Sequence, residues 1–184
     1  MRKLAAVLCV VLMLAMGVTA FANPSIGAIT VSLVDVQTND ALPEGMWIAV
    51  MPANPFNYAN DAVKTVVSTV NDPEKSMTVK EAAQVLGAAD PGDYDFVTNF
   101  QELVLTDGTN VYFDNAGANV SGKAVMTVDA LKGASDISAY KMMILNPTTG
   151  EIHILDLDPS SFNAETGEIT VDFPCLGAFS LIQK

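Results

Sequence analysis

The sequence is poor in the side chains that most often carry catalysis. It holds one histidine, His153, and two cysteines among 184 residues, and its one arginine is Arg2. Transition-metal sites need clusters of His and Cys, and a guanidinium is the usual group for holding phosphate or carboxylate. We therefore expect no catalytic, cofactor-binding or metal-binding residues of these kinds.

Positive charge is also scarce. Nine Lys and Arg residues stand against 21 Asp and Glu, which gives a formal net charge of −12. Residues 1–22 carry two of the nine cations and none of the acids, so the remaining chain has a balance of 7 − 21 = −14. Such a surface repels polyanions, so we expect neither nucleic acid nor an anionic membrane as a partner.

Residues 1–22 have the pattern of a secretory signal peptide. Arg2 and Lys3 precede an apolar run over 4–18, and Ala20-Phe21-Ala22 provides the small-x-small cleavage pattern. An N-terminal membrane anchor is the alternative, but the run is about fifteen residues, and spanning a bilayer takes roughly twenty. We expect export by the bacterial Sec route and a secreted, extracellular chain that begins at Asn23.

Removal of that segment would leave Cys175 as the single cysteine, so no intramolecular disulfide could form. This suits an exported bacterial protein, and one from an anaerobe in particular. Cys175 stands between Pro174 and Leu176 near several acids, so we expect a buried apolar side chain rather than a reactive thiol. A catalytic pair of Cys175 with His153 is the alternative, but we expect His153 to be an outward-facing strand residue.

A repeated phrase organises the C-terminal third. Residues 146–152 are Asn-Pro-Thr-Thr-Gly-Glu-Ile, and residues 163–169 are Asn-Ala-Glu-Thr-Gly-Glu-Ile. Both lie between apolar runs; the Asn side chain can bond the turn backbone, and the Gly accepts a positive φ. The phrase predicts two β-hairpins. At Gly150 and Gly167 we expect Asn to be tolerated better than Ala, and Gly133 lies in a predicted loop where substitution costs less.

Other strands follow from apolar alternation and turn residues. In chain order they are predicted over 26–36, 46–51, 102–106, 111–113, 123–128 and 178–182. The segments 102–106 and 111–113 flank Asp107-Gly108 and predict a hairpin. Pro174 and Gly177 predict a bulge or a sheet edge before the last strand.

Two helices are predicted in the first half. Asn60 or Asp61 can cap a helix that runs to about residue 70, although its many valines also permit a strand. Thr78 and Glu81 have the spacing of a capping box, and the helix that they begin is expected to end at Gly87.

These patterns predict a mainly β (α+β) fold. After the signal peptide at 1–22, we expect an N-terminal α+β region over 23–115 and a C-terminal antiparallel β unit over 116–184. The boundary falls in the segment 114–122, which is rich in Asn, Gly and Ala.

The C-terminal unit has a recognisable order of motifs. A strand at 123–128 is followed by Tyr-Lys-Met-Met-Ile-Leu at 140–145, two Thr-Gly-Glu turns, and the closing Gly-Ala-Phe-Ser at 177–180. This order resembles the immunoglobulin-like β-sandwich modules of secreted and wall-associated proteins from Gram-positive bacteria of the gut-anaerobe type. The resemblance implies an Ig-like β-sandwich and a structural or binding role, and it transfers no catalytic residue.

Calcium is the one ion whose ligands are present in groups. The two sets are Asp90, Asp93 and Asp95, and Asp156 with Asp158. Neither follows the spacing of an EF-hand loop, and aspartates that form turns explain both sets, so we expect no metal here either.

The sequence therefore predicts an exported, non-enzymatic interaction or structural module at or outside the bacterial envelope, with a protein or a glycan as ligand. The alternative is a secreted carbohydrate-active hydrolase. It would need two carboxylates in the N-terminal half, near Trp47, Tyr58 and Tyr94, where a sugar ring could stack.

Overall fold

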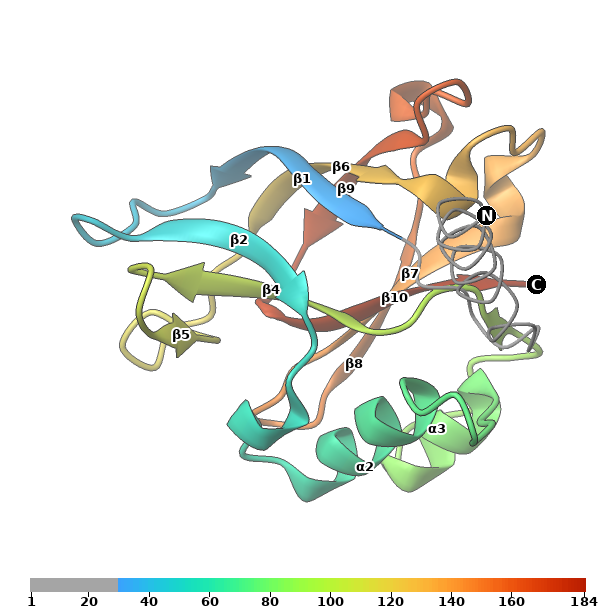
Figure 1. Cartoon of the computed structure of the whole chain (residues 1–184), viewed down its shortest axis with the longest axis horizontal. Coiled ribbons are helices and arrows are strands. Elements are labelled where there is room, and N and C mark those ends of the chain that lie inside the picture. Colours follow the sequence, from blue (N-terminus) through green and yellow to red (C-terminus); the bar gives the residue numbers. More distant parts are fainter. Residues whose placement is uncertain (1–29) are drawn as a thin grey trace, which may run out of the picture.

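The computed structural model describes residues 30–184, so the predicted signal peptide and Asn23 lie outside the described residues. This part of the chain is mainly β, with two antiparallel sheets and two α-helices, which confirms the predicted fold class at that level. Figure 1 shows the smaller sheet on one side of the larger one and the helices on the other. Within residues 30–184, no helix is long and apolar enough to cross a membrane.

The larger sheet has seven strands. Five follow the order β2 (Trp47–Pro52), β4 (Gln101–Thr106), β10 (Gly177–Gln183), β7 (Tyr140–Leu145) and β8 (Ile152–Asp156). Two short strands complete it, as β3 (Asp95–Phe96) pairs with β10 and β5 (Val111–Tyr112) pairs with β4. The smaller sheet has the order β1 (Val31–Thr38), β6 (Gly122–Val128) and β9 (Glu168–Phe173).

Each sheet contains strands from both of the regions predicted on either side of residue 115. In the larger sheet β10 lies between β4 and β7, and in the smaller sheet β6 lies between β1 and β9. The two regions thus share their backbone hydrogen bonds. Strand β1 covers residues 31–36 of the segment predicted at 26–36 and continues to Thr38, and its register shifts between Leu33 and Asp35.

The first repeated phrase forms the predicted hairpin between β7 and β8. Gly150 N donates to Asn146 O at 2.9 Å, and the Asn146 side chain accepts from the backbone N–H groups of Thr148 and Thr149. The second phrase forms the same turn: Gly167 N donates to Asn163 O at 2.8 Å, and the Asn163 side chain accepts two backbone N–H groups.

The strands around the second turn differ from the prediction. Strands β8 and β9 lie in different sheets, and the turn closes on a single bridge between Asn163 and Glu168. After β8 the chain makes a 3₁₀ turn at Pro159–Ser161, whose first backbone groups are capped by Asp158. This detour carries β9 to β6, where Ile169, Val171 and Phe173 are buried.

The expectation of a bulge or an edge at the last strand is also wrong. Pro174, Cys175 and Leu176 connect the two sheets, and β10 occupies the middle of the larger sheet, where all its residues up to Ile182 are buried. Its lack of charged side chains fits a strand that is covered on both faces.

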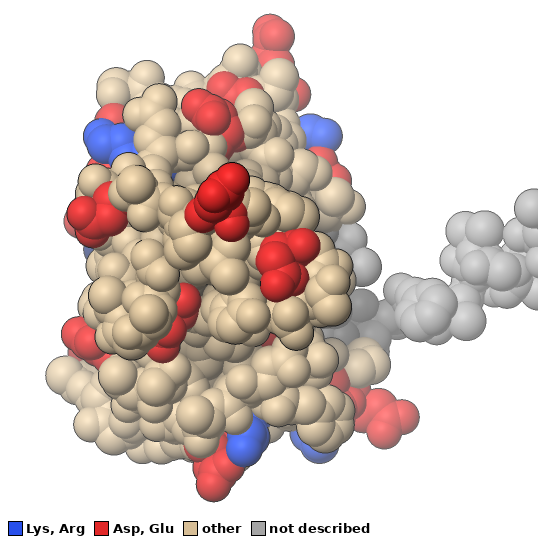
Figure 2. Space-filling model, turned by 90° about the vertical axis from the view of Figure 1, so that its left-hand side faces the viewer, with Lys and Arg blue, Asp and Glu red and all other residues tan. Residues whose placement is uncertain are grey.

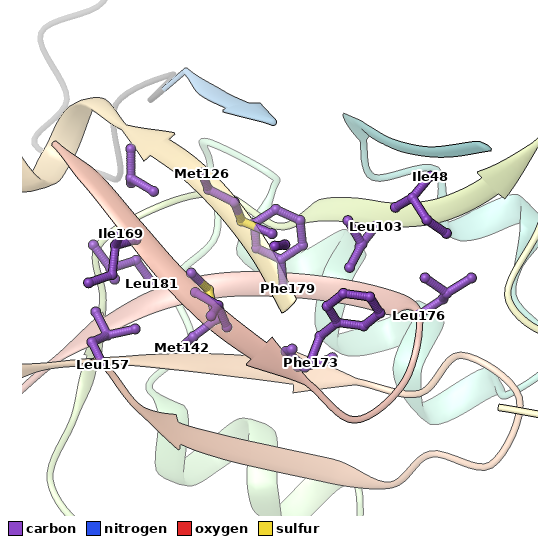
Figure 3. Close-up of a cluster of buried hydrophobic side chains, with 14 of the residues drawn as sticks. Ile48, Leu103, Met126, Met142, Leu157, Ile169, Phe173, Leu176, Phe179 and Leu181 are labelled. Carbon is purple, nitrogen blue, oxygen red and sulfur yellow. The ribbon is translucent and has the colours of Figure 1, made fainter. Parts of the chain in front are cut away.

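The core lies between the two sheets, as Figure 3 shows. Met142 and Ile144 of β7 face this core, while the alternate residues Met143 and Leu145 face the helices. A second apolar cluster forms there with the buried valines of α2 (Asp61–Val70). The larger sheet is therefore apolar on both faces. The smaller sheet covers one face, and the helices cover the other.

Both predicted helices are confirmed. Helix α2 (Asp61–Val70) begins after Asn60, whose side chain accepts from two backbone N–H groups, and its buried residues are Val63, Val66, Val67 and Val70. This one-sided burial against the sheet explains why a valine-rich segment is helical. Helix α3 (Val79–Val85) has the expected capping box of Thr78 and Glu81. The other short helical turns are 3₁₀ turns at Pro55–Asn57 (η1), Asp129–Leu131 and Ile137–Ala139.

Candidate binding site around Phe56

An exposed aromatic side chain marks the segment that follows β2. Phe56 lies in η1 and is 94% exposed, whereas the other exposed large apolar side chains of the described chain range from 38% to 57%. An apolar ring gains no burial energy in such a position. The contacts of the neighbouring residues therefore have to account for the exposed position of Phe56.

Short-range contacts fix the turn itself. Pro55 occupies the start of η1, where its fixed φ suits a helical turn and its missing N–H costs nothing. The Asn54 side chain accepts from Phe56 N at 3.3 Å, and Tyr58 N donates to Pro55 O at 3.2 Å. These contacts hold the backbone of Phe56 in one conformation.

A buried carboxylate holds the first end of this turn. Glu102 of β4 is 2% exposed and accepts a hydrogen bond from the backbone N–H of Asn54. Burial raises the pKa of the Glu102 carboxyl, and the hydrogen bond from Asn54 offsets part of that rise. A carboxylate in such a place is costly unless it is hydrogen-bonded, so the contact ties η1 to β4 of the larger sheet.

Tyr58 holds the other end. It is 3% exposed, and its ring meets Phe113 edge-to-face with centroids 5.6 Å apart. Burial raises the pKa of its hydroxyl, and the negative charge of Glu102 raises it further. Among residues 30–184 this hydroxyl is the one buried side-chain polar atom without a hydrogen bond of good geometry. The next two N–H groups, of Ala59 and Asn60, both donate to Pro147 O.

Phe56 stands at the edge of a hollow of about 300 Å³. One wall is the turn, with Ala53, Pro55 and Phe56; the other is polar and comes from α2 and its end, with Lys64, Ser68, Asn71 and Asp72. Asn71 is committed to the backbone of Phe100 through both amide atoms. Asp72 lies 2.8 Å from Lys75 Nζ, which helps to keep the pKa of its carboxyl low. The site thus combines an apolar wall with a polar one.

The aromatic residues predicted for a hydrolase site do not come together. Trp47 pairs with Thr106 at one end of β4, while Tyr94 precedes β3, which pairs with the last residues of β10 at the other end of the sheet. The Tyr94 ring lies 5.8 Å from Lys141 Nζ. Tyr58 is buried and offers no face to a ligand.

Cys175 is buried, as predicted, with 1% of its surface exposed. Burial raises the pKa of its thiol to about 11, with a further rise from the charge of Glu151 and an opposing contribution from Asn146. His153 is in β8 as expected, but it is half-buried rather than outward-facing, and its Nε2 lies 3.7 Å from Glu151 Oε1. A buried thiol with a raised pKa is a poor nucleophile.

Three of the five aspartates considered for calcium have structural partners. Asp90 lies 2.7 Å from Lys80 Nζ and accepts from Gly92 N, and Asp156 lies 2.7 Å from Lys141 Nζ. Asp158 caps a 3₁₀ turn. In residues 30–184 no three His, Cys, Asp or Glu side chains are grouped so as to hold a metal ion.

A second hollow, of about 290 Å³, lies between the end of α3 and the edge strand β8. Its lining is mostly alanine and aliphatic, and its one charged residue, Asp90, is paired with Lys80. It has no exposed aromatic residue and no rigid anchor like the one under Phe56.

Sequence reasoning missed both Phe56 and Glu102. The signal for Phe56 was an aromatic residue within Pro-Ala-Asn-Pro-Phe-Asn, where turn residues prevent it from joining a strand or helix. The signal for Glu102 was a lone charge in the otherwise uncharged strand segment over 101–106.

Comparisons with protein-family models, with curated proteins and with solved structures found no match for this chain.

Proposed function

We propose that this protein is an exported, non-enzymatic interaction module that acts at or outside the bacterial envelope and binds its ligand at Phe56. The observation that carries the proposal is the exposure of that ring on a turn whose backbone is held in place. Phe56 is almost fully exposed, yet the turn beneath it is fixed by Glu102 at one end and by Tyr58 at the other.

Exposure on a fixed turn suits a binding anchor. A backbone that is already fixed loses little conformational entropy when a ligand covers the side chain that it carries. It also offers a large apolar area, which is why aromatic residues dominate binding energies at interfaces. The buried carboxylate of Glu102 fits this role because it holds the backbone of the turn that carries Phe56.

The non-enzymatic part of the proposal rests on the side chains near Phe56. The hollow contains no histidine or cysteine, and its carboxylate, that of Asp72, is engaged with Lys75 and with the backbone of Glu74. The finer fold assignment, an Ig-like module, belongs to the same proposal and is supported by the two antiparallel sheets packed around one core. The alternative of a carbohydrate-active hydrolase has no specific observation in its favour in the described residues.

The test is a pull-down with the chain from Asn23 onwards against cell-wall, glycan and host-surface fractions. Wild type is compared with Phe56→Ser, which removes the ring and leaves the fold intact because the ring is exposed. Tyr112→Ser is the matched control, since Tyr112 is an exposed aromatic residue that does not line the hollow. Thermal melts of the three proteins are expected to agree closely.

We expect wild type and Tyr112→Ser to retain a ligand from at least one fraction, and Phe56→Ser to lose it. If wild type retained nothing from any fraction, the proposal of an interaction module would fail. If Phe56→Ser retained as much as wild type, the assignment of the site would fail.

A further inference from the structure

We infer that the ligand held at Phe56 is an uncharged glycan, with a pyranose ring stacked on the phenyl ring and hydroxyl groups turned toward helix α2. This inference rests on the proposed function and adds the chemical class of the ligand. It follows from three features of the hollow: its two unlike walls, the charge around it, and its size.

The two walls match the two sides of a sugar ring. A pyranose has an apolar face of C–H groups and a rim of hydroxyl groups, so it needs an aromatic surface on one side and polar groups on the other. Pro55 and Phe56 supply the first, and the electron-rich face of an aromatic ring attracts the polarised C–H groups. The opposite wall has the exposed hydroxyl group of Ser68 beside Lys64 and Asp72, which are paired with Asp61 and Lys75.

Charge favours a neutral ligand over an anionic one. The one cation of the hollow, Lys64, already lies 2.7 Å from Asp61 Oδ1, and Asp72 adds a negative charge to the lining. The whole chain carries a net charge of −12. Figure 2 shows acidic side chains scattered over one face of the molecule, with the few lysines near its margins. A polyanionic glycan would meet repulsion on approach and no free cation at the site.

Size and surroundings favour a glycan over a protein partner. Protein interfaces of ordinary size bury about 800 Å² on each side and have an apolar centre from which charges are depleted. The residues around Phe56 are polar instead, since Asn54, Asn57, Asp61 and Ser68 are all exposed. A hollow of about 300 Å³ is at the small end of ligand sites and suits one or two units of a chain.

The experiment titrates the chain from Asn23 onwards with defined oligosaccharides and measures their binding by NMR chemical-shift changes and by calorimetry. The neutral probes are cellohexaose, mannohexaose, xylohexaose, maltohexaose and N-acetylchitohexaose. An oligogalacturonide of similar length is the anionic control. Probe concentrations reach about 5 mM, at which a millimolar Kd is measurable.

Four variants locate the contact. Phe56→Ser removes the stacking surface, while Phe56→Trp keeps one and is expected to bind as wild type does. Ser68→Ala shortens the polar wall on an exposed helix position, and Tyr112→Ser is the control outside the hollow. We expect at least one neutral probe to bind wild type, with about tenfold or greater loss in Phe56→Ser, a smaller loss in Ser68→Ala, and none in Tyr112→Ser.

The inference is overturned if no neutral probe binds, if the oligogalacturonide binds better than every neutral probe, or if Phe56→Ser binds as tightly as wild type. A parallel pull-down separates this failure from that of the proposed function. Capture that depends on Phe56, survives periodate and is destroyed by protease would identify a protein ligand. The proposed interaction module would then be supported, and the assignment of a glycan ligand would be wrong.

Discussion

Three turn glycines provide a quantitative test of the structure. Gly133, Gly150 and Gly167 have φ angles of +76°, +82° and +72°, so a new side chain meets nearly the same backbone strain at each position. What differs is the space available to a Cβ atom. At Gly133 nothing lies within 4 Å; at Gly150 the Asn60 amide nitrogen would lie at 2.6 Å, and at Gly167 the backbone oxygen of Val128 would lie at 2.5 Å.

The expected costs follow from these contacts. A Cβ in the left-handed region costs about 1–2 kcal/mol, and replacing Gly by Ala returns about 0.4–1 kcal/mol by restricting the unfolded chain, so Gly133→Ala should lose about 1 kcal/mol. Gly150→Ala also displaces Asn60, the cap of α2, at a further cost of about 1 kcal/mol. Gly167→Ala presses on backbone, where overpacking costs about 1–3 kcal/mol more.

The assay is denaturant unfolding with matched thermal melts, in which about 1 kcal/mol shifts the Tm by roughly 2–4 °C in a chain of this size. Asn variants separate strain from contact. Asn tolerates a positive φ, so it should restore stability at Gly133, but it carries the same Cβ and should not do so at Gly167. This revises the expectation from sequence that Asn rescues both repeated turns. Equal losses for Gly133→Ala and Gly167→Ala, or rescue by Asn at Gly167, would refute the reasoning.

Four further outcomes are expected. The raised pKa of Glu102 means that the folded protein holds this proton more tightly than the unfolded chain, so its contribution to stability is full at acid pH and declines as pH rises above the ordinary carboxyl range. Glu102→Gln should abolish that decline in melts from about pH 4 to pH 8, because Gln still accepts from Asn54; a variant with unchanged pH dependence would contradict the assignment. Cys175 should react with a thiol reagent only after unfolding, and rapid labelling of the folded protein would show that it is accessible. Millimolar calcium should leave the Tm nearly unchanged, whereas a rise of several degrees that a chelator reverses would reveal a specific site. Expression in a bacterial host with intact secretion should yield a chain that begins at Asn23, and an intact mass that includes Met1 would disprove cleavage.

Local chemistry in the sequence predicted local structure well. The capping box at Thr78 and Glu81, the cap at Asn60 and both Asn-to-Gly turns appear as expected, because each depends on residues within a few positions of one another. Strand pairing was not predictable in the same way. Two nearly identical turns lead to different partners, since the partner of β9 is set by packing against β6 and not by the turn that precedes it.

The candidate site depended on contacts across the chain and was therefore out of reach of sequence patterns. Asn54 and Glu102 are 48 positions apart, and only the register of β2 against β4 brings them together. The aromatic residues that the sequence did single out, Trp47 and Tyr94, are conspicuous by type but lie at opposite ends of the larger sheet. Residue type alone gave no information on which aromatic ring would be exposed on a fixed turn.

The central place of β10 has a consequence for the order of assembly. A ribosome makes residues 47–156 before residues 177–183, and with them every strand of the larger sheet except β10, which joins β4 to β7. Until residues 177–183 are made, the strands paired with β4 and the hairpin of β7 and β8 share no strand-to-strand backbone hydrogen bonds. Sheet closure thus depends on pairing between distant segments, a slow step in folding. The nascent chain therefore cannot form the whole larger sheet until residues 177–183 have been made.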